Sequence, residues 1–229
     1  MTILHIAHLR SNPYNGVCVV APEHIRHQGA LADVALLNIR DCQIENIEHQ
    51  FVYHGKNWKD DVAPQFQRPD IVVFHEVYHV EFARIAKSLV KENIPYIIIP
   101  HGSLVMEAQR KKWWKKVLAN LFVFNHFIHY SAAIQCLSDN ELVNTLFKTQ
   151  KFIGTNGVKI PAAYKTEYGS DGLKITYIGR LEKYSKGLDL LLKAIARIKP
   201  YLIEFGVKVE MYGADILGWF DTLQAMISA

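Results

Sequence analysis

Residues 175–187, ITYIGRLEKYSKG, form a short apolar run followed by a loop that holds two cations. The first four residues are β-branched or aromatic, which predicts a buried strand that ends in a tight turn at Gly179. Arg180 and Lys186 lie in the loop, and Gly187 closes it. The segment therefore predicts a strand followed by a cationic loop with a glycine at each end.

A helix is predicted directly after this loop, because apolar residues recur at helical spacing from 188 to 198. Where a loop enters a helix, backbone N–H groups and the helix dipole favour negative charge, and Arg and Lys side chains bind phosphate oxygens. We predict that Gly179, Arg180, Lys186 and Gly187 bind the diphosphate of an activated donor. The alternative is a solvated surface loop that binds no ligand.

The composition is that of an ordinary globular protein. The chain has 229 residues, of which 50% are hydrophobic and 21% charged, and a net charge of +4 gives no indication of nucleic-acid binding. Its 3 cysteines are odd in number and far apart, as is typical of reduced thiols. The start of the chain lacks a signal-peptide pattern, and no segment has the length and apolar character of a membrane span. We expect a soluble, cytoplasmic protein.

The first 160 residues alternate apolar strands with amphipathic helices, which is typical of an α/β domain with a parallel sheet. We expect the first helix to begin near Ala21, since Pro22 suits a first turn, and to end with Gly29 in the C′ position. Ser138 and Glu141 have the spacing of a capping box and predict another helix start. Predicted strands span residues 2–7, 33–38, 51–53, 69–74, 95–99, 132–136 and 151–153. Helical character extends over 17–28, within which the first helix is expected, and further helices are predicted at 80–91 and, with breaks, 106–129.

The remaining residues predict a linker and part of a second domain. Residues 161–172 are polar and rich in turn-forming residues, as in a linker. Beyond them, strands are expected at 175–178 and 207–212, one helix from 188 to about Pro200, and another at 218–229. Two strands and two helices cannot cover both faces of a parallel sheet, so this second domain is expected to be incomplete.

Residues 75–79, HEVYH, match the H-E-x-x-H pattern of zinc proteases. In that motif a continuous helix places both histidines on one face, with the glutamate beside the metal-bound water. Here a predicted strand leads directly into His75, so the helical context is absent. We therefore assign no metal ligand from the sequence.

Six segments match, in order along nearly the whole chain, the motifs of one enzyme family. They are the Gly16 loop after the first strand, PDIVVFH (69–75), PYIIIPHG (95–102), CLSDNE (136–141), TNGV (155–158) and YIGRLEKYSKGLD (177–189). Together they resemble the GT-B retaining glycosyltransferases of the group 1 or family 4 type. The missing G-x-G-x-x-G pattern disfavours the competing interpretation, a nucleotide-dependent oxidoreductase.

The resemblance implies an α/β fold of GT-B type with two Rossmann-like domains. Residues 1–160 would form the acceptor-side domain, 161–172 the linker, and 173–229 part of the nucleotide-sugar-binding domain. The activity implied is transfer of a sugar, with retention, from a nucleotide diphosphate sugar to a saccharide or lipid-linked acceptor, in surface polysaccharide or glycolipid synthesis. The nucleotide sugar is a co-substrate, and no cofactor is implied.

The same resemblance implies roles for individual residues. His101 would lie beside the transferred sugar, and Arg180 and Lys186 would bind the donor diphosphate and stabilise the charge of the leaving group. These three are the candidate catalytic residues. Gly16 would let the backbone approach the donor or acceptor, with Gly179 and Gly187 completing the donor site. For His101, a structural hydrogen bond at a strand end is the alternative.

The chain also departs from the family pattern. Val158 is followed by Lys159 where the family usually has an aspartate, and the family's paired-glutamate element lies beyond residue 229. We therefore expect this chain alone to be inactive or nearly so. The alternative function is a non-catalytic relative that binds an acceptor or pairs with a chain that supplies the other half of the domain.

Residues 110–116, RKKWWKK, mix cations with indoles, as interfacial helices do. This pattern predicts acceptor-side or peripheral membrane contact through Lys111, Lys112, Trp113, Trp114, Lys115 and Lys116, at the inner face of a membrane. The alternative is a solvated helix whose tryptophans pack inward. The sequence leaves both open, because five cations make a modest basic patch.

Overall fold

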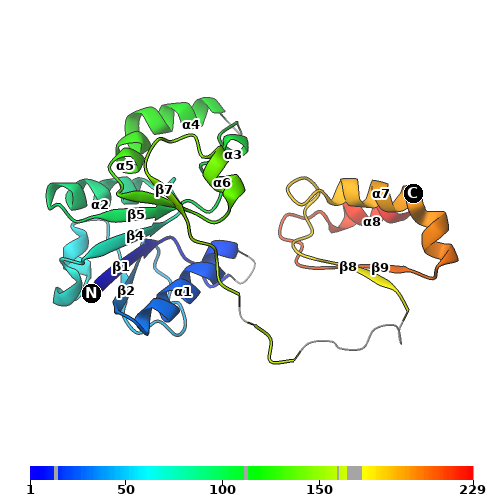
Figure 1. The fold of residues 1–229 in the computed structure, drawn as a ribbon, viewed down its shortest axis with the longest axis horizontal. Helices are drawn as coiled ribbons and strands as arrows, with labels where there is room; N and C mark the ends of the chain where they lie inside the picture. Colours follow the sequence, from blue (N-terminus) through cyan, green and yellow to red (C-terminus); the bar gives the residue numbers. More distant parts are fainter. Residues whose placement is uncertain (13–14, 111–112, 159, 164–171, 229) are drawn as a thin grey trace. The chain divides into compact units, whose positions relative to one another are not determined.

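The computed structural model describes residues 1–12, 15–110, 113–158, 160–163 and 172–228. The chain divides into two compact units, Met1–Val158 (unit 1) and Lys159–Ala229 (unit 2), which are described one at a time (Figure 1). Of the predicted linker, residues 164–171 lie outside the described residues.

Unit 1 is a parallel β-sheet with helices on both faces, so the predicted α/β fold is confirmed. The strands lie in the order β3-β2-β1-β4-β5-β6-β7, and every neighbouring pair is parallel. The elements are β1 (Thr2–Ala7), α1 (Gly16–Gly29), β2 (Asp33–Asn38), β3 (Gln50–Val52), η1 (Trp58–Asp61), η2 (Pro64–Phe66), β4 (Ile71–His75), α2 (Val80–Lys91), β5 (Tyr96–Ile99), α3 (Met106–Arg110), α4 (Trp113–Ala119), the π-helix η3 (Asn120–Phe124), α5 (Asn125–His129), β6 (Ala133–Cys136), α6 (Asp139–Asn144) and β7 (Lys151–Ile153).

Each face of this sheet has its own apolar core. Alternate residues of the central strands pack against α1 on one face and against α2 and α5 on the other (Figure 1). Ile3, Ala7 and Val73 belong to the α1 face, whereas Leu4 and Phe74 belong to the opposite one. This burial on both sides explains why β1 and β4 are nearly continuous apolar runs in the sequence.

The strand order reverses between β1 and β4. The chain proceeds from β1 to β2 and β3 on one side, then returns to place β4 on the other side of β1. In open parallel sheets, ligands bind outside the carboxyl ends of the strands at such a switch point. The residues that follow β1, β4 and β5 are therefore the first place to look for a site.

Two predicted helix boundaries in unit 1 are wrong. Helix α1 begins at Gly16 rather than near Ala21, with Pro22 inside it, and the Asn15 side chain caps it by accepting the Val17 N–H at 3.0 Å. Burial of Val17 and Ala21 against the sheet outweighs the one backbone hydrogen bond that the proline removes. Gly29 is the last helical residue, and the C-cap is a right-handed Ala30, so no left-handed C′ glycine ends this helix.

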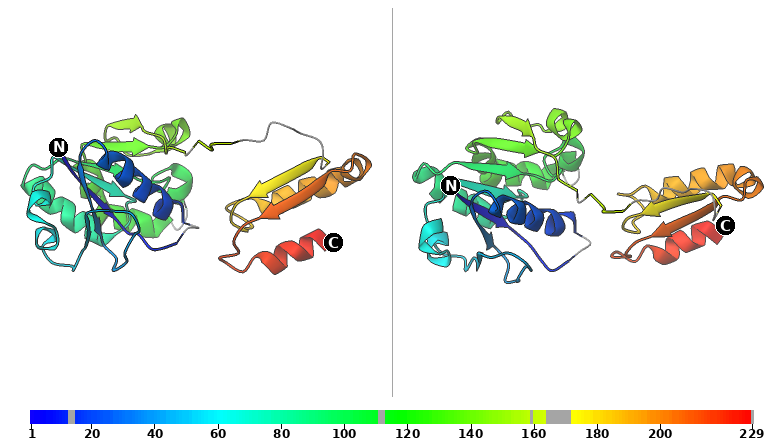
Figure 2. Two further views of the ribbon diagram at one scale, coloured as in Figure 1. Left: turned by 90° about the horizontal axis from the view of Figure 1, so that it is seen from below. Right: turned by 60° about the horizontal axis from the view of Figure 1, so that its bottom comes forward.

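In its described residues, unit 2 contains two parallel strands and two helices (Figure 2). They are β8 (Lys174–Ile178), α7 (Leu188–Glu204), β9 (Lys208–Tyr212) and α8 (Phe220–Ser228). Residues Leu188, Leu192 and Leu223 of the helices form a small core with partly buried Tyr177 and Met211 of the strands. Helix α7 runs through Pro200 to Glu204, beyond its predicted end.

The prediction that residues 175–178 form a buried strand is wrong in one respect, since β8 is a strand but is largely exposed. The side chain of Ile178 is 82% exposed. Successive strand residues point to opposite faces, so Ile178 points away from the face that carries Tyr177 and the helical core. Within the described residues, none of the helices has the length and apolar character needed to cross a bilayer.

Candidate functional site

His101 lies two residues beyond β5, at the carboxyl edge of the sheet in unit 1. Its backbone is left-handed (φ 49°), as is that of Gly102 (φ 78°). Such a conformation is uncommon for a residue with a Cβ, although histidine adopts it more readily than most. The turn therefore holds the His101 side chain in one direction, next to the end of β4.

A buried glutamate fixes this turn. Glu141 Oε1 accepts a hydrogen bond from the Gly102 N–H at 2.7 Å, and Oε2 accepts one from the Leu137 N–H at 2.6 Å. Ser138 caps α6 as predicted, with its side chain accepting the Glu141 N–H at 3.2 Å. In a capping box the glutamate would bond back to the N-cap N–H. Here its carboxylate instead joins the start of α6 to the His101 turn.

Three histidines form a hydrogen-bonded series, which we call the histidine chain (His5, His75 and His101). His5 lies in β1, His75 ends β4, and His101 lies in the turn after β5. The distance from His5 Nδ1 to His75 Nε2 is 2.9 Å, and that from His75 Nδ1 to His101 Nε2 is 3.3 Å. Their rings stack with centroids 5.2 and 5.6 Å apart. His5 Nε2 continues the series to Gln28 Oε1 on α1 at 2.8 Å.

The hydrogen bond to Gln28 determines the tautomer of the whole histidine chain. An amide oxygen only accepts, so His5 Nε2 carries the hydrogen and His5 Nδ1 accepts from His75 Nε2–H. By the same step His75 Nδ1 accepts from His101 Nε2–H. All three rings are then neutral and carry hydrogen on Nε2. The Nδ1 lone pair of His101 remains available to accept a hydrogen bond from a ligand.

Burial keeps the histidine chain uncharged. It lowers the pKa of His5 to about 4, against a small opposing effect of the Gln28 hydrogen bond. It also lowers the pKa of His101 to about 4, where the Glu76 carboxylate opposes the shift. The pKa of His75 lies well below its ordinary value, first from burial and then from His5 and His101. Near neutral pH the histidine chain therefore presents the neutral imidazole of His101, not an imidazolium, at the sheet edge.

The residues of the HEVYH segment separate in the structure. His75 is the last residue of β4 and points into the histidine chain, whereas Glu76 and His79 follow the strand and lie together, with Glu76 Oε2 3.0 Å from His79 Nε2. As expected from the strand context, this is not the helical zinc-protease arrangement. His8, after β1, lies beside them, with its ring centroid 4.6 Å from that of His79.

The cationic loop lies in unit 2, between β8 and α7. Arg180 and Lys186 are both exposed, and Gly187 is left-handed (φ 64°) as the N-cap of α7. Arg180 Nη2 lies 3.5 Å from Glu182 Oε2, a surface pair that contributes little stability. The Tyr177 hydroxyl donates to the Arg180 carbonyl at 2.9 Å. The loop thus places both predicted cations in solvent at the start of a long helix.

The surroundings of Gly179 and Gly213 are crowded, whereas those of Gly16 are open. A Cβ on Gly179 would lie 2.6 Å from the Tyr177 hydroxyl oxygen, and one on Gly213 would lie 1.7 Å from the Gly179 carbonyl oxygen. A Cβ on Gly16 would meet no atom within 4 Å. Among the described residues, therefore, none requires a glycine at position 16, the first residue of α1.

The basic segment exposes its tryptophans. Trp113 is 64% and Trp114 54% exposed, so the alternative in which they pack inward is wrong. Lys115 lies over the Trp114 ring, and Lys116 donates to the Ala108 carbonyl at 2.7 Å. The two remaining predicted residues, Lys111 and Lys112, lie outside the described residues.

The sequence located His101 and the cationic loop but missed the residues around His101. His5 and Gln28 carry no functional signal in the sequence, and Glu141 stands out only through its place in the capping-box pattern. His75 belongs to the family-like strand and to the HEVYH segment. The available signal was a histidine inside β1 and another at the end of β4, since neighbouring parallel strands can bring such residues together.

No protein-family profile matches the chain, and no curated protein sequence does either. Among solved structures the chain is similar to MnaA of S. aureus in a co-structure with UDP, with 10% identity and a TM-score of 0.53 over 99% of this chain and 66% of the MnaA chain. The UDP-GlcNAc 2-epimerase of Methanocaldococcus jannaschii gives 14% identity and a TM-score of 0.42, over 100% of this chain and 76% of that one. The UDP-N-acetylglucosamine 2-epimerase of Rickettsia bellii gives 10% identity and a TM-score of 0.42, over 100% of this chain and 64% of that one.

At such low identity the likeness to MnaA establishes the fold alone. It extends over nearly the whole chain, and the chain spans about two thirds of the MnaA length, at 66%. The predicted fold class, α/β and Rossmann-like as in GT-B proteins, is confirmed.

Proposed function

We propose that this chain is part of a glycosyltransferase that moves a sugar, with retention, from a nucleotide diphosphate sugar to a saccharide or lipid-linked acceptor. The observation that carries the proposal is the histidine chain, which ends in His101 at the carboxyl edge of the sheet. The six ordered motif matches support the same activity. The donor sugar would contact His101, and its diphosphate would contact Arg180 and Lys186.

His101 would hold the sugar as a hydrogen-bond acceptor. The histidine chain gives its Nδ1 atom a lone pair and fixes its ring, while Glu141 fixes its backbone turn through Gly102. A sugar hydroxyl donates to such an atom without the desolvation cost of a charged group. The neutral ring also leaves the developing positive charge of an oxocarbenium-like sugar unopposed.

Arg180 and Lys186 would neutralise the leaving nucleotide diphosphate. When the bond between the sugar and the phosphate oxygen breaks, negative charge grows on that oxygen. Two cations beside the N-terminus of α7 stabilise this charge, in the manner of other electrostatic catalytic sites. Both side chains are exposed, so they are accessible to a ligand from solvent.

Binding of UDP tests the donor site without requiring turnover. UDP is the probe because the fold relative MnaA was solved with it. Isothermal titration calorimetry should show UDP binding to the wild-type chain, weakened at least about tenfold in Arg180→Ala and Lys186→Ala, since each loses a charge-assisted phosphate contact. Lys193→Ala, an exposed lysine within α7, is the matched control and should bind UDP as the wild type does.

His101→Asn tests the sugar contact separately. Asparagine tolerates the left-handed backbone, so the turn should persist. We expect UDP affinity to be unchanged in this chain. In a version extended through a complete second domain, hydrolysis or transfer of UDP-hexoses should fall about 100-fold, the scale of one lost stabilising group. Equal turnover by the extended variant and the extended wild type would contradict the role of His101. UDP binding without any turnover by the extended wild type would favour the non-catalytic alternative.

Peripheral membrane contact through the basic segment belongs to the same proposal. The exposed Trp113 and Trp114 are followed on α4 and η3 by exposed Val117, Leu121 and Phe122. Cations beside exposed aromatic and aliphatic side chains suit the interface of an anionic bilayer. In liposome sedimentation at low salt, the wild type should pellet with anionic vesicles and a Trp113→Ser/Trp114→Ser double variant should not. A wild type that stays in the supernatant would end this part of the proposal.

A second candidate is a non-catalytic interaction protein whose unit 2 pairs with another chain. The exposed apolar side chains of unit 2 favour it, among them Ile178, Ile203, Phe205 and Leu217. Light scattering coupled to gel filtration distinguishes the candidates. A stable oligomer that dissociates in Ile178→Ser and binds no UDP would support the interaction protein over the transferase.

A further inference from the structure

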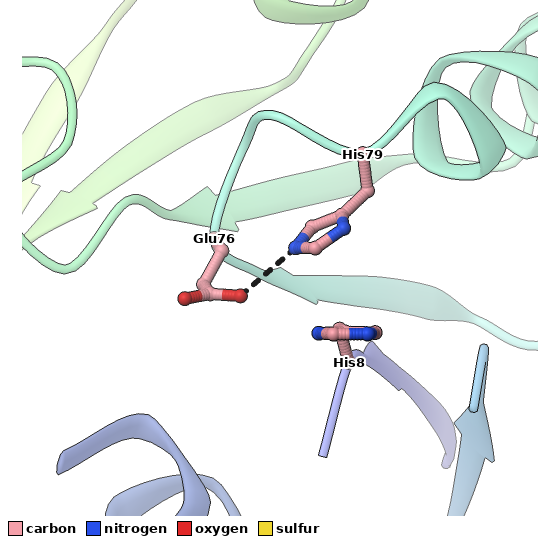
Figure 3. A group of neighbouring side chains, drawn as sticks. All are labelled: His8, Glu76 and His79. Carbon is pink, nitrogen blue, oxygen red and sulfur yellow. Dashed lines mark hydrogen bonds and ion pairs between the residues drawn. The ribbon is translucent and has the colours of Figure 1, made fainter. Parts of the chain in front are cut away.

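His8, Glu76 and His79 form a compact group of side chains at the switch point of the sheet. Each offers one potential ligand atom, and these atoms all lie within 4.8 Å of one another. Figure 3 shows the carboxylate of Glu76 and the two imidazoles converging on the same space. His8 comes from the segment after β1, whereas Glu76 and His79 come from the loop between β4 and α2.

We propose that His8, Glu76 and His79 bind a divalent transition-metal ion of the Zn²⁺ type. The sequence alone led to the opposite expectation, because it paired His75, not His8, with Glu76 and His79. In the structure both ring nitrogens of His75 bond to His5 and His101, and His8 is the second histidine beside Glu76 and His79. Two imidazoles and one carboxylate are a ligand set of catalytic zinc sites, which keep a fourth position open.

The geometry of the group suits this ion after small side-chain movements. Zinc–nitrogen and zinc–oxygen bonds of about 2.0–2.1 Å in a tetrahedral arrangement place ligand atoms about 3.3 Å apart. The Glu76 Oε2 to His79 Nε2 distance is already 3.0 Å. All three side chains are partly buried, so a bound ion would be shielded from part of the solvent while one side stays open.

Backbone hydrogen bonds position the two ligands that follow β4. The Glu76 N–H donates to the Ile99 carbonyl of β5 at 2.8 Å, and the His79 N–H donates to the Val77 carbonyl at 2.9 Å. Glu76 itself is left-handed (φ 80°), which turns its side chain out of the strand direction. The loop is therefore held in the shape that brings Glu76 back to His79.

Arg40 competes with a metal ion at this place. Its Nη1 atom donates to His8 Nε2 at 3.4 Å, so this cation occupies one nitrogen of a proposed ligand and repels a second cation. The Glu76 carboxylate has the opposite effect, because its negative charge attracts a metal ion. Removal of Arg40 should therefore strengthen metal binding, which distinguishes a metal site from a simple network of hydrogen bonds.

The test is calorimetric titration of Zn²⁺ into the full chain. We expect one strong site per chain in the wild type, with affinity reduced at least about 100-fold in His8→Ala and in Glu76→Gln, because even loss of an outer-shell partner costs 10–100-fold. Arg40→Met should bind Zn²⁺ several-fold more tightly than the wild type. Co²⁺ in place of Zn²⁺ should give visible absorption bands of a four-coordinate site, absent in Glu76→Gln.

A matched control is available on α1. His27 and Glu23 also form a histidine–glutamate pair, with Nε2 and Oε2 3.7 Å apart, and the His27 side chain is 85% exposed. His27→Ala should leave Zn²⁺ affinity unchanged. Circular dichroism checks that each variant is folded. The proposal is overturned if the folded wild type binds no Zn²⁺ at one ion per chain, or if His8→Ala and Glu76→Gln bind it as tightly as the wild type. These outcomes do not depend on UDP or on turnover.

Discussion

Units 1 and 2 both place a strand, a helix and a parallel strand in succession, but they bury their strands differently. In unit 1 helices cover both faces of a seven-stranded sheet, and the central strands are buried. In unit 2 the core lies on one face of two strands, and Ile178 faces solvent. The same local pattern therefore yields a desolvated site only where both faces of the sheet are covered.

This difference separates the two kinds of site. The histidine chain needs a dry environment, because burial is the main cause of the lowered pKa values of His5 and His101. The loop with Arg180 and Lys186 needs no burial, because exposed arginine and lysine side chains are already charged and accessible to a phosphate. We therefore expect substitutions in unit 1 to change stability and the site together, and substitutions in unit 2 to change mainly ligand binding.

The largest expected effect comes from the core of unit 1. Phe74 is fully buried and packs against the rings of Phe82, Tyr96 and Phe127. Phe74→Ala should lower the free energy of unfolding of unit 1 by about 3–5 kcal/mol, through lost burial and a cavity. Hydrogen-exchange mass spectrometry on β1 and β4 peptides measures it, with β8 peptides as the internal reference. Equal loss of protection in β8 would show that the units are one cooperative body.

A pH effect of similar size is expected from the histidine chain. Burial lowers the folded-state pKa of His5 from 6.5 to about 4, so the unfolded state binds the proton more readily. The free energy of unfolding is therefore highest above pH 6.5 and decreases as the pH falls towards 4. His5 alone should account for a decrease on the order of 3 kcal/mol. Urea denaturation at several pH values measures how steeply the free energy of unfolding changes with pH. His5→Leu should make this dependence weaker. A wild-type free energy of unfolding that does not change between pH 6.5 and 4 would refute the lowered pKa of His5.

A smaller effect is expected at Glu141, which joins α6 to the His101 turn. Glu141→Ala leaves the Gly102 and Leu137 N–H groups without their carboxylate partner and should cost about 2–3 kcal/mol. Exchange of the Gly102 amide should rise more than that of β5 amides, since the turn is released first. Thr145→Ala, which removes a buried hydroxyl from the C-cap at the other end of α6, is the control for general weakening of this helix. Unchanged Gly102 exchange would show that the turn holds without Glu141.

The smallest effect is expected at the exposed face of unit 2. Ile178→Ala removes a side chain that is 82% exposed and should change the free energy of unfolding by less than about 0.5 kcal/mol. Thermal unfolding followed by circular dichroism is sensitive enough to detect a larger change in the free energy of unfolding. A loss above 1 kcal/mol would mean that this face is covered in solution, and the contrast between the units would then disappear.

Much of the fold could be predicted from the sequence. The buried strands of unit 1 are short apolar runs between turn residues, and the predicted helix at 80–91 has the bounds of α2, because its apolar spacing is regular. The errors at Pro22, Pro200 and Ile178 share one cause. Each depends on what packs against the segment, which a local pattern does not contain.

The order of strands and helices, the motif resemblance, and the place of His101 and the cationic loop along the chain follow from the sequence. Which side chains meet depends on the packing of the strands and helices. The order β2-β1-β4-β5 brings His5 within hydrogen-bonding distance of His75, 70 residues later, and turns His75 away from Glu76 and His79. The physical reason is that neighbouring strand residues point to opposite faces, whereas contacts across a sheet depend on strand order and register.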